Sequence, residues 1–391
     1  MNVSLTLDHW CDLRCTYCYT GFKSRRPMSL DVAEKALRRA FARPEPLTRV
    51  SFFGGEPLLA LDLLDTIATR ARELADQAGV RVCFAVTTNG TQLATGRSEV
   101  FDVLRRHRVL VTVSIDGDEA AHDAGRRGPG GHGSFERVVA GLRLAKERLG
   151  PVRTLSVVHP GNVRRLPASF AFLRSLDVRQ LAFNLDYSAH WDAESIGELD
   201  QAYVELADNA IAAFRAGEDF VLRPFHTRIV SQVKGGWPEE GRCDFGSKDL
   251  AVAPSGRIYP CDRLIGEDGP REEPLVIGHV DTGVDLHRLL ALRRPKDQLK
   301  PDCEGCALDR RCVWWCGCIN HAATGRTDGV EGLLCHTEQV VIREADRVAT
   351  TLFAEGNTAF FSRYYLAAAK AVSAQVPLAP NVAKASVDPA P

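Results

Sequence analysis

The residues Trp10 to Tyr19, WCDLRCTYCY, carry three cysteines, Cys11, Cys15 and Cys18, at the spacing CxxxCxxC. Three soft thiolates on one loop can bind three irons of a [4Fe–4S] cube and leave the fourth iron open to another ligand. The alternative is a structural zinc site. Such a site uses four ligands, and the next cysteine, Cys83, stands alone in a predicted strand. The spacing therefore favours an iron–sulfur site on this loop.

Strand and helix patterns alternate on both sides of the loop. Residues 2–9 alternate apolar and polar side chains, which predicts a strand that leads into the cysteines, and Ser29 is placed to cap a helix that ends near Phe41. Further strands are predicted at 49–53, 80–87, 109–115, 154–158 and 180–185, and helices at 58–78, 99–106, 134–149, 163–176 and 196–216. About six β/α units follow, so we expect an α/β fold with a parallel sheet.

Three polar, glycine-containing turns follow predicted strands in order. They are residues 53–57 (FGGEP), 87–91 (TTNGT) and 114–117 (SIDG). One such turn alone is ordinary turn chemistry. Three at the carboxyl ends of parallel strands, on the face that carries the cysteines, predict a binding site there.

A second group of cysteines lies towards the C-terminus. Seven of them follow fixed intervals: Cys243, Cys261, Cys303, Cys306, Cys312, Cys316 and Cys335. Twelve cysteines in the whole chain are many for a reducing compartment, where metal or redox chemistry is a better use for them than disulfides. A two-zinc domain is the competing interpretation of the seven.

Together, the CxxxCxYC loop after a first strand, the GGEP turn and the seven-cysteine pattern resemble radical S-adenosylmethionine (SAM) enzymes with a SPASM extension, over about residues 3–345. The resemblance implies a partial (β/α)6 barrel followed by a cysteine-rich SPASM domain with two auxiliary clusters. It also implies that the open iron of the first [4Fe–4S] cluster binds SAM, whose reductive cleavage gives a 5′-deoxyadenosyl radical that takes a hydrogen atom from the substrate.

The resemblance assigns roles to residues at the strand ends. It places Tyr17 beside the adenine and lets Asn89 and Ser114 reach the ribose or the methionyl group. The turn of Gly54, Gly55, Glu56 and Pro57 would meet the amino group of SAM, with Glu56 supporting it electrostatically or orienting the loop. Asp116 is a further candidate contact, and an aspartate before glycine is also ordinary in a turn. The segment 122–133, rich in charge and then in glycine, would border the substrate channel or form a solvated loop.

For the SPASM part, the resemblance implies an outer cluster on Cys303, Cys306, Cys312 and Cys335, and an inner cluster on Cys243, Cys261 and Cys316, which is one cysteine short. Water, a carboxylate, Cys318 or the substrate could complete the inner set. Asp262 lies where sulfatase-maturing members place a catalytic base, and a purely structural role is the alternative. With the first cluster, three [4Fe–4S] clusters and SAM are the expected cofactors.

Four segments are predicted: a barrel at 1–235, the SPASM domain at 241–345, C-terminal helices at 346–375 and a disordered tail at 376–391. The 49 basic and 50 acidic residues give no electrostatic argument for nucleic acid or an anionic membrane. Residues 1–10 lack the features of a signal peptide and no apolar run is long enough to span a bilayer, so we expect a cytoplasmic protein.

The first functional hypothesis is a maturase of ribosomally made peptides that installs a crosslink or an oxidation. Its expected partners are a peptide or protein substrate, an electron donor such as flavodoxin or ferredoxin, and a separate leader-binding protein if the barrel itself does not recognise the leader. An anaerobic sulfatase maturase that forms formylglycine is second, disfavoured by the missing eighth cysteine. A radical enzyme on a small molecule is third. A non-catalytic electron carrier would not need the three turn motifs.

Overall fold

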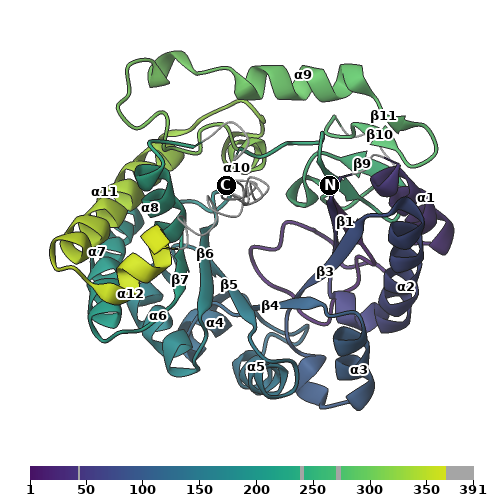
Figure 1. Ribbon diagram of the computed structural model, residues 1–391, viewed down its shortest axis with the longest axis horizontal. Helices are drawn as coiled ribbons and strands as arrows, with labels where there is room; N and C mark the ends of the chain where they lie inside the picture. Colours follow the sequence, from purple (N-terminus) through teal and green to yellow (C-terminus); the bar gives the residue numbers. More distant parts are fainter. Residues whose placement is uncertain (43–44, 238–241, 270–273, 367–391) are drawn as a thin grey trace, which may run out of the picture.

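The computed structural model describes residues 1–42, 45–237, 242–269 and 274–366. Within these ranges, eleven strands form one sheet in the order β11-β10-β9-β8-β1-β2-β3-β4-β5-β6-β7. The seven strands from β1 to β7 are parallel to their neighbours and form the arc seen in Figure 1. They are β1 (Asn2–Thr6), β2 (Leu47–Phe53), β3 (Arg81–Thr88), β4 (Leu110–Ser114), β5 (Arg153–Val158), β6 (Gln180–Leu185) and β7 (Val221–Arg223).

Helices cover the outside of this arc (Figure 1). They are α1 (Leu30–Phe41), α2 (Leu61–Ala78), α3 (Ser98–Arg106), α5 (Phe135–Leu149), α6 (Leu166–Ser175), α7 (Ala193–Arg215) and α8 (Phe225–Val233). The short helix α4 (Glu119–Gly125) follows the carboxyl end of β4, where the Gly125 carbonyl accepts from the Thr16 amide at 3.0 Å. The strands bury alternate residues, as in β2, where Val50 and Phe52 are fully buried. Because side chains alternate across a strand, one face packs on the helices and the other faces the inside of the arc. The predicted partial barrel is confirmed.

Local signals set the ends of the predicted elements. The Ser29 hydroxyl accepts a hydrogen bond from the Val32 amide at 3.2 Å, as expected of an N-cap. The predicted helix at 58–78 is divided into a 3-10 turn (Pro57–Ala60) and α2. The sequence did not reveal β7, because three residues are too few to show a period of two.

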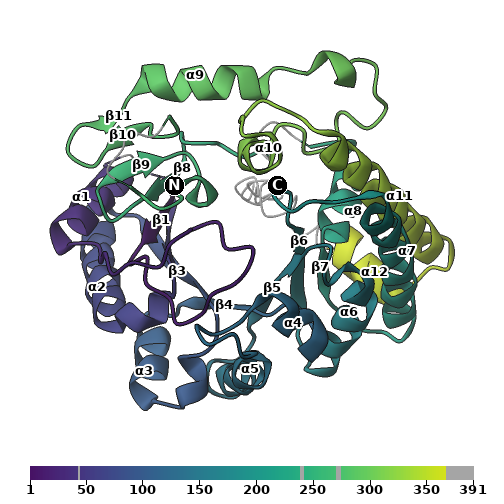
Figure 2. The same ribbon diagram turned by 180° about the vertical axis from the view of Figure 1, so that it is seen from behind.

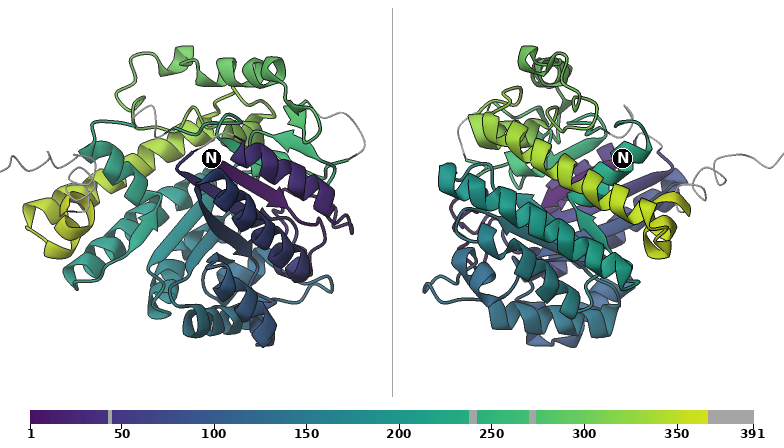
Figure 3. Two further views of the ribbon diagram at one scale, coloured as in Figure 1. Left: turned by 45° about the vertical axis from the view of Figure 1, so that its right-hand side comes forward. Right: turned by 90° about the vertical axis from the view of Figure 1, so that its left-hand side faces the viewer.

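The C-terminal part extends the same sheet past β1. Strand β8 (Asp249–Val252) pairs parallel with β1, and β9 (Arg257–Tyr259), β10 (Gly278–His279) and β11 (Gly283–Val284) follow antiparallel. Helix α9 (Leu286–Asp297) and helix α10 (Gly317–Thr324) lie across the opening between the two ends of the arc (Figure 1). Helix α11 (Gly332–Ala354) then packs along α7 and α8, and α12 (Thr358–Phe361) follows it (Figure 3).

The proposed division into domains stays a prediction, since the sheet is continuous from β7 to β11. The predicted tail at 376–391 lies outside the described residues. Of the C-terminal helices predicted at 346–375, the described part comprises the end of α11, then α12 and a π-helical turn at Ser362–Leu366. Among the described residues, none of the helices combines the length and apolar character needed to cross a bilayer.

Candidate functional site

The cysteine loop, residues 7–29, leaves the carboxyl end of β1 and crosses the mouth of the arc (Figure 2). The end of β2 fixes its first part, because the Gly55 amide donates to the Asp8 carbonyl at 2.8 Å and the Glu56 amide donates to the Trp10 carbonyl at 2.9 Å. A Cβ at Gly55 would lie 2.1 Å from the Trp10 oxygen, and a Cβ at Gly54 would lie 2.4 Å from the Asp8 oxygen. Both glycines are therefore required by the approach of the cysteine loop itself.

Glu56 links the ends of β2 and β3 from a fully buried position. Its Oε1 accepts from the Thr88 hydroxyl at 2.7 Å and its Oε2 accepts from the Asn89 amide at 2.6 Å. The Leu58 amide also donates to it at 3.0 Å, where Pro57 begins the 3-10 turn. Burial raises the pKa of Glu56 to about 7. These contacts favour the loop-orienting alternative for this residue.

Asn89 faces the cysteine loop from the end of β3. Its Nδ2 donates to Asp12 Oδ1 at 2.8 Å and lies 3.6 Å from the Cys11 sulfur. The Thr91 hydroxyl donates to the other oxygen of Asp12 at 2.8 Å. The TTNGT turn thus holds the residue that follows the first cysteine. The sequence did not single out Asp12, whose role depends on a turn almost eighty residues away.

Tyr17 is held from the end of β4. Its hydroxyl donates to Asp116 Oδ2, and Arg126 Nε donates to Asp116 Oδ1 at 3.0 Å. The Arg126 guanidinium also lies over the Tyr17 ring, 5.4 Å from its centroid, and the His159 ring lies 5.5 Å from it on centroids. The structure thus brings two predicted SAM contacts, Tyr17 and Asp116, into one buried cluster. Ser114, another predicted SAM contact, is the last residue of β4 and is buried two residues before Asp116.

The three thiols of the loop have different surroundings. Burial, followed by the charge of Glu56, raises the pKa of Cys11 to about 12. Burial opposes the thiolate of Cys18, but Lys23, itself buried, donates to that sulfur at 2.8 Å, and the net effect lowers the Cys18 pKa. Sequence reasoning missed Lys23, although its distance of five residues from Cys18 is local. Cys11 is buried, Cys15 and Cys18 are partly buried, and three such thiols on one loop fit iron, whose positive charge stabilises the thiolates.

Within the described ranges, no three His, Cys, Asp or Glu side chains are arranged around a single metal ion. A [4Fe–4S] cube differs from such a site because each thiolate binds a different iron.

The seven C-terminal cysteines form two groups in space. In the outer group, burial and then the charges of Cys335 and Cys306 raise the pKa of Cys303, and Cys312 lies within electrostatic reach of it. Cys335 lies in the first turn of α11. In the inner group, burial and the charge of Cys316 raise the pKa of Cys243 to about 11. Thiols that raise one another's pKa in this way lie near one another, and such a group fits a site for an iron–sulfur cluster.

Asp262 follows Cys261 at the start of a 3-10 turn (Asp262–Leu264). Its Oδ1 accepts from the Arg263 amide at 2.9 Å and lies 3.4 Å from the Cys261 sulfur. Partial burial, then the charge of Asp262, raises the pKa of Tyr19 on the cysteine loop. The carboxylate therefore contacts Cys261 of the inner group and lies within electrostatic reach of the cysteine loop.

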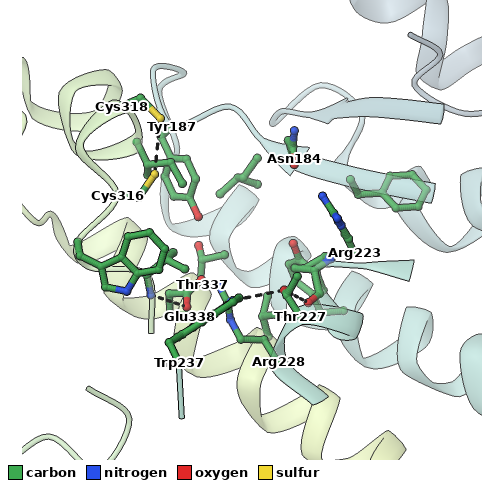
Figure 4. A pocket seen from close by; sticks show the side chains of 18 of the residues that line it. Asn184, Tyr187, Arg223, Thr227, Arg228, Trp237, Cys316, Cys318, Thr337 and Glu338 are labelled. Atoms are coloured by element: carbon green, nitrogen blue, oxygen red, sulfur yellow. Dashed lines mark hydrogen bonds and ion pairs between the residues drawn. The ribbon is translucent and has the colours of Figure 1, made fainter. Parts of the chain in front are cut away.

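A cavity of about 300 Å³ opens at the carboxyl ends of β6 and β7 (Figure 4). Asn184 and Arg223 line it from the barrel side, and Cys316 and Cys318 line the opposite wall with Tyr187 beside them. Below them, Arg228 Nη2 donates to Glu338 Oε1 at 2.5 Å in a pair that is 5% exposed on each side. This pair joins α8 to α11 and closes one end of the cavity.

A comparison with known protein families identifies the part of the chain that carries the cysteine loop. Residues 6–172 match the model of the Radical SAM superfamily. These residues form a radical SAM domain. The match begins at the last residue of β1 and ends inside α6, so it contains the cysteine loop and all three turn motifs.

Sequence relatives align with most of the chain, including the part that follows the radical SAM domain. The "PqqA peptide cyclase" of Gluconobacter oxydans is 24% identical over 93% of this chain and 98% of its own length. The "Cysteine-type anaerobic sulfatase-maturating enzyme" of Clostridium novyi is 25% identical over 64% of this chain and 70% of its own length. A solved structure of "Native anSMEcpe with bound AdoMet and Cp18Cys peptide" has a TM-score of 0.74 at 19% identity and covers 90% of this chain and 99% of its own. The last likeness shows that the fold is that of a radical SAM enzyme with a SPASM-type extension.

Proposed function

We propose that the protein is a peptide-modifying radical SAM/SPASM enzyme that installs a crosslink or a side-chain oxidation in a ribosomally made peptide. The observation that carries the proposal is the cavity at the ends of β6 and β7, which has barrel residues on one wall and Cys316 and Cys318 on the other. Its volume of about 300 Å³ is at the low end for ligand pockets and suits one or two side chains of a longer molecule. The peptide cyclase that aligns over nearly its whole length supports the same substrate class.

The residues of the site have distinct proposed tasks. A [4Fe–4S] cluster with SAM, when bound, supplies the 5′-deoxyadenosyl radical that takes a hydrogen atom from the substrate. Cys11, Cys15 and Cys18 hold that cluster, while Glu56 and Asn89 fix the loop that carries them. Tyr17, Ser114 and Asp116 border SAM, together with the backbone of residues 54–57. The outer and inner cysteine groups hold two auxiliary clusters.

Arg223 suits the binding of the peptide. Its guanidinium is exposed at the end of β7 and faces the cavity, and among the described residues it forms neither an ion pair nor a hydrogen bond (Figure 4). A free guanidinium donates readily to carboxylates and carbonyls, so we propose that it binds a carbonyl or an acidic side chain of the substrate. The electron donor, such as flavodoxin or ferredoxin, any leader-binding partner and a cytoplasmic location are parts of the same proposal.

The test uses protein reconstituted anaerobically with iron and sulfide, then reduced in the presence of SAM. We expect 5′-deoxyadenosine, and a loss of two hydrogen atoms from a peptide encoded beside the gene, mapped by mass spectrometry to a crosslink or an oxidised residue. Changing Cys11, Cys15 and Cys18 together to alanine should remove about a third of the iron and all SAM cleavage. SAM cleavage that persists in this variant would place the radical chemistry elsewhere in the chain. If the reconstituted wild-type protein does not cleave SAM, the hypothesis of a non-catalytic electron carrier would be favoured instead.

A sulfatase maturase is the second candidate, favoured by the position of Asp262 beside Cys261 and by the sulfatase-maturating relative. In that role Asp262 takes the proton from the side chain that is oxidised. Conversion of a cysteine in a sulfatase-type peptide to an aldehyde, without a crosslink, would decide for this candidate. Asp262→Asn should then keep SAM cleavage and lower product formation, whereas unchanged turnover would leave the aspartate a structural role.

A further inference from the structure

The inner cysteine group has a fourth member, Cys318. It lies in the first turn of α10, and its sulfur is 3.5 Å from that of Cys316 (Figure 4). The thiols of Cys318 and Cys261 are likewise close enough to share a hydrogen bond. Cys318 thus contacts two of the three cysteines that the sequence pattern assigned to the inner cluster.

The packing of α10 brings this pair to the segment that carries Cys243. A Cβ at Gly317, between the two cysteines, would lie 2.7 Å from the ring of Phe245, which is two residues after Cys243 and fully buried. Only a glycine permits this contact between the start of α10 and the Phe245 ring. The four cysteines therefore come from three segments that are packed directly against one another.

Buried polar contacts hold the start of α10 in place. Lys296 Nζ donates to the Trp315 carbonyl at 3.0 Å, and Asn320 Nδ2 donates to the Trp314 carbonyl at 2.9 Å. Lys296 is 1% exposed and Asn320 is fully buried. A buried donor that loses its acceptor destabilises the fold, so these hydrogen bonds hold Cys316 and Cys318 in place.

The carboxylate alternative for the fourth ligand is Asp262. It contacts one cysteine of the group, Cys261, and its Oδ1 is also the acceptor for the Arg263 amide. Cys318 contacts two cysteines, and a thiolate is a softer ligand that iron–sulfur clusters prefer to a carboxylate.

We propose that Cys318 is the fourth ligand of the inner auxiliary cluster, so that Cys243, Cys261, Cys316 and Cys318 saturate it. This inference rests on the proposed function, because it assumes that the inner group holds a cluster. A saturated cluster has no free iron for a substrate thiolate, so the substrate in the adjoining cavity meets the cysteine sulfurs and not the metal. Cys318 would also serve as the eighth cysteine, whose lack had counted against the sulfatase maturase. The number of cysteine ligands therefore no longer distinguishes the two candidate functions.

The first test is alkylation of each cysteine, compared between the apoprotein and the anaerobically reconstituted protein and quantified by mass spectrometry. We expect reconstitution to slow the labelling of Cys318 by about tenfold or more, as for Cys243, Cys261 and Cys316, because a metal-bound thiolate is a poor nucleophile. Cys83, on β3 and outside both cysteine groups, is the internal control and should label equally in the two states.

The outcomes separate this inference from the proposed function. Protection of the three other inner cysteines, with Cys318 labelled as fast as in the apoprotein, overturns the ligand assignment alone. Labelling of all four at the apoprotein rate overturns the inner cluster itself, and the assignment with it.

A second measurement uses Cys318→Ser beside Cys83→Ser as the matched control. With ⁵⁷Fe, the Cys318 variant should show an altered Mössbauer signal for one cluster, or lose up to about a third of its iron, whereas the control should match the wild type. A Cys318→Ser spectrum and iron content identical to those of the wild type would contradict the proposal.

Discussion

The buried ion pair between Asp116 and Arg126 gives a quantitative test of how the cysteine loop is anchored. The side chains are 0% and 8% exposed, and Asp116 accepts bonds from Arg126, from the Tyr17 hydroxyl and from the Val157 amide. Arg126→Met leaves a buried carboxylate with no cationic partner. Removing one member of such a pair costs about 3–5 kcal/mol.

The expected shift in melting temperature follows from the length of the chain. At about 2.1 cal/mol/K per residue, the unfolding entropy of 391 residues means that each kcal/mol shifts Tm by about 1.2 °C. Arg126→Met should therefore lower Tm by about 4–6 °C, measured on reconstituted protein at one heating rate.

The matched control is Arg165→Met. Its partner Asp118 lies two residues beyond Asp116, but the side chains of that pair are 46% and 21% exposed. A pair this open to water contributes about 0–1 kcal/mol, so Tm should fall by no more than about 1 °C. Equal shifts in Tm for the two variants would refute the claim that burial makes the Asp116–Arg126 pair important for stability. The double variant Asp116→Asn, Arg126→Met should recover part of the loss, since no unpaired charge remains.

Three further predictions concern the strand-end turns. Burial raises the pKa of Glu56 from 4.5 to about 7, so as pH rises through this window the unfolded chain ionises first and the free energy of unfolding falls by roughly 3 kcal/mol. Glu56→Gln should flatten this part of the pH profile, and parallel profiles from denaturation of the two proteins would contradict the shift. Gly55→Ala places a methyl group 2.1 Å from a carbonyl oxygen of the cysteine loop and should reduce iron binding by about a third, whereas Gly197→Ala, in open space on α7, should leave iron content unchanged. Asn89→Asp sets a second carboxylate against Asp12, a repulsion on the order of 4 kcal/mol that should lower Tm and iron loading, and wild-type values of both would exclude this contact.

The sequence predicted features that depend on short-range order. The spacing of Cys11, Cys15 and Cys18 was enough to predict the first cluster site, because all three lie on one loop. Alternating periods of two and 3.6 identified β1 to β6 and most of the helices, and the order of strands and helices implied a parallel arc with its site at the carboxyl ends. Very short strands such as β7 were missed, since their pairing partners and not their own residues determine them.

Only the tertiary structure decided which distant side chains meet. Glu56 joins two strand ends, and Arg126 completes a cluster with Asp116 and Tyr17, although these residues are spread over more than a hundred positions. Cys318 was one of four open possibilities in the sequence, and its contact with Cys316 and Cys261 singled it out. The physical reason is that local spacing fixes neighbours along one element, whereas contacts between elements depend on strand register and close packing, as where Gly317 lets α10 reach Phe245.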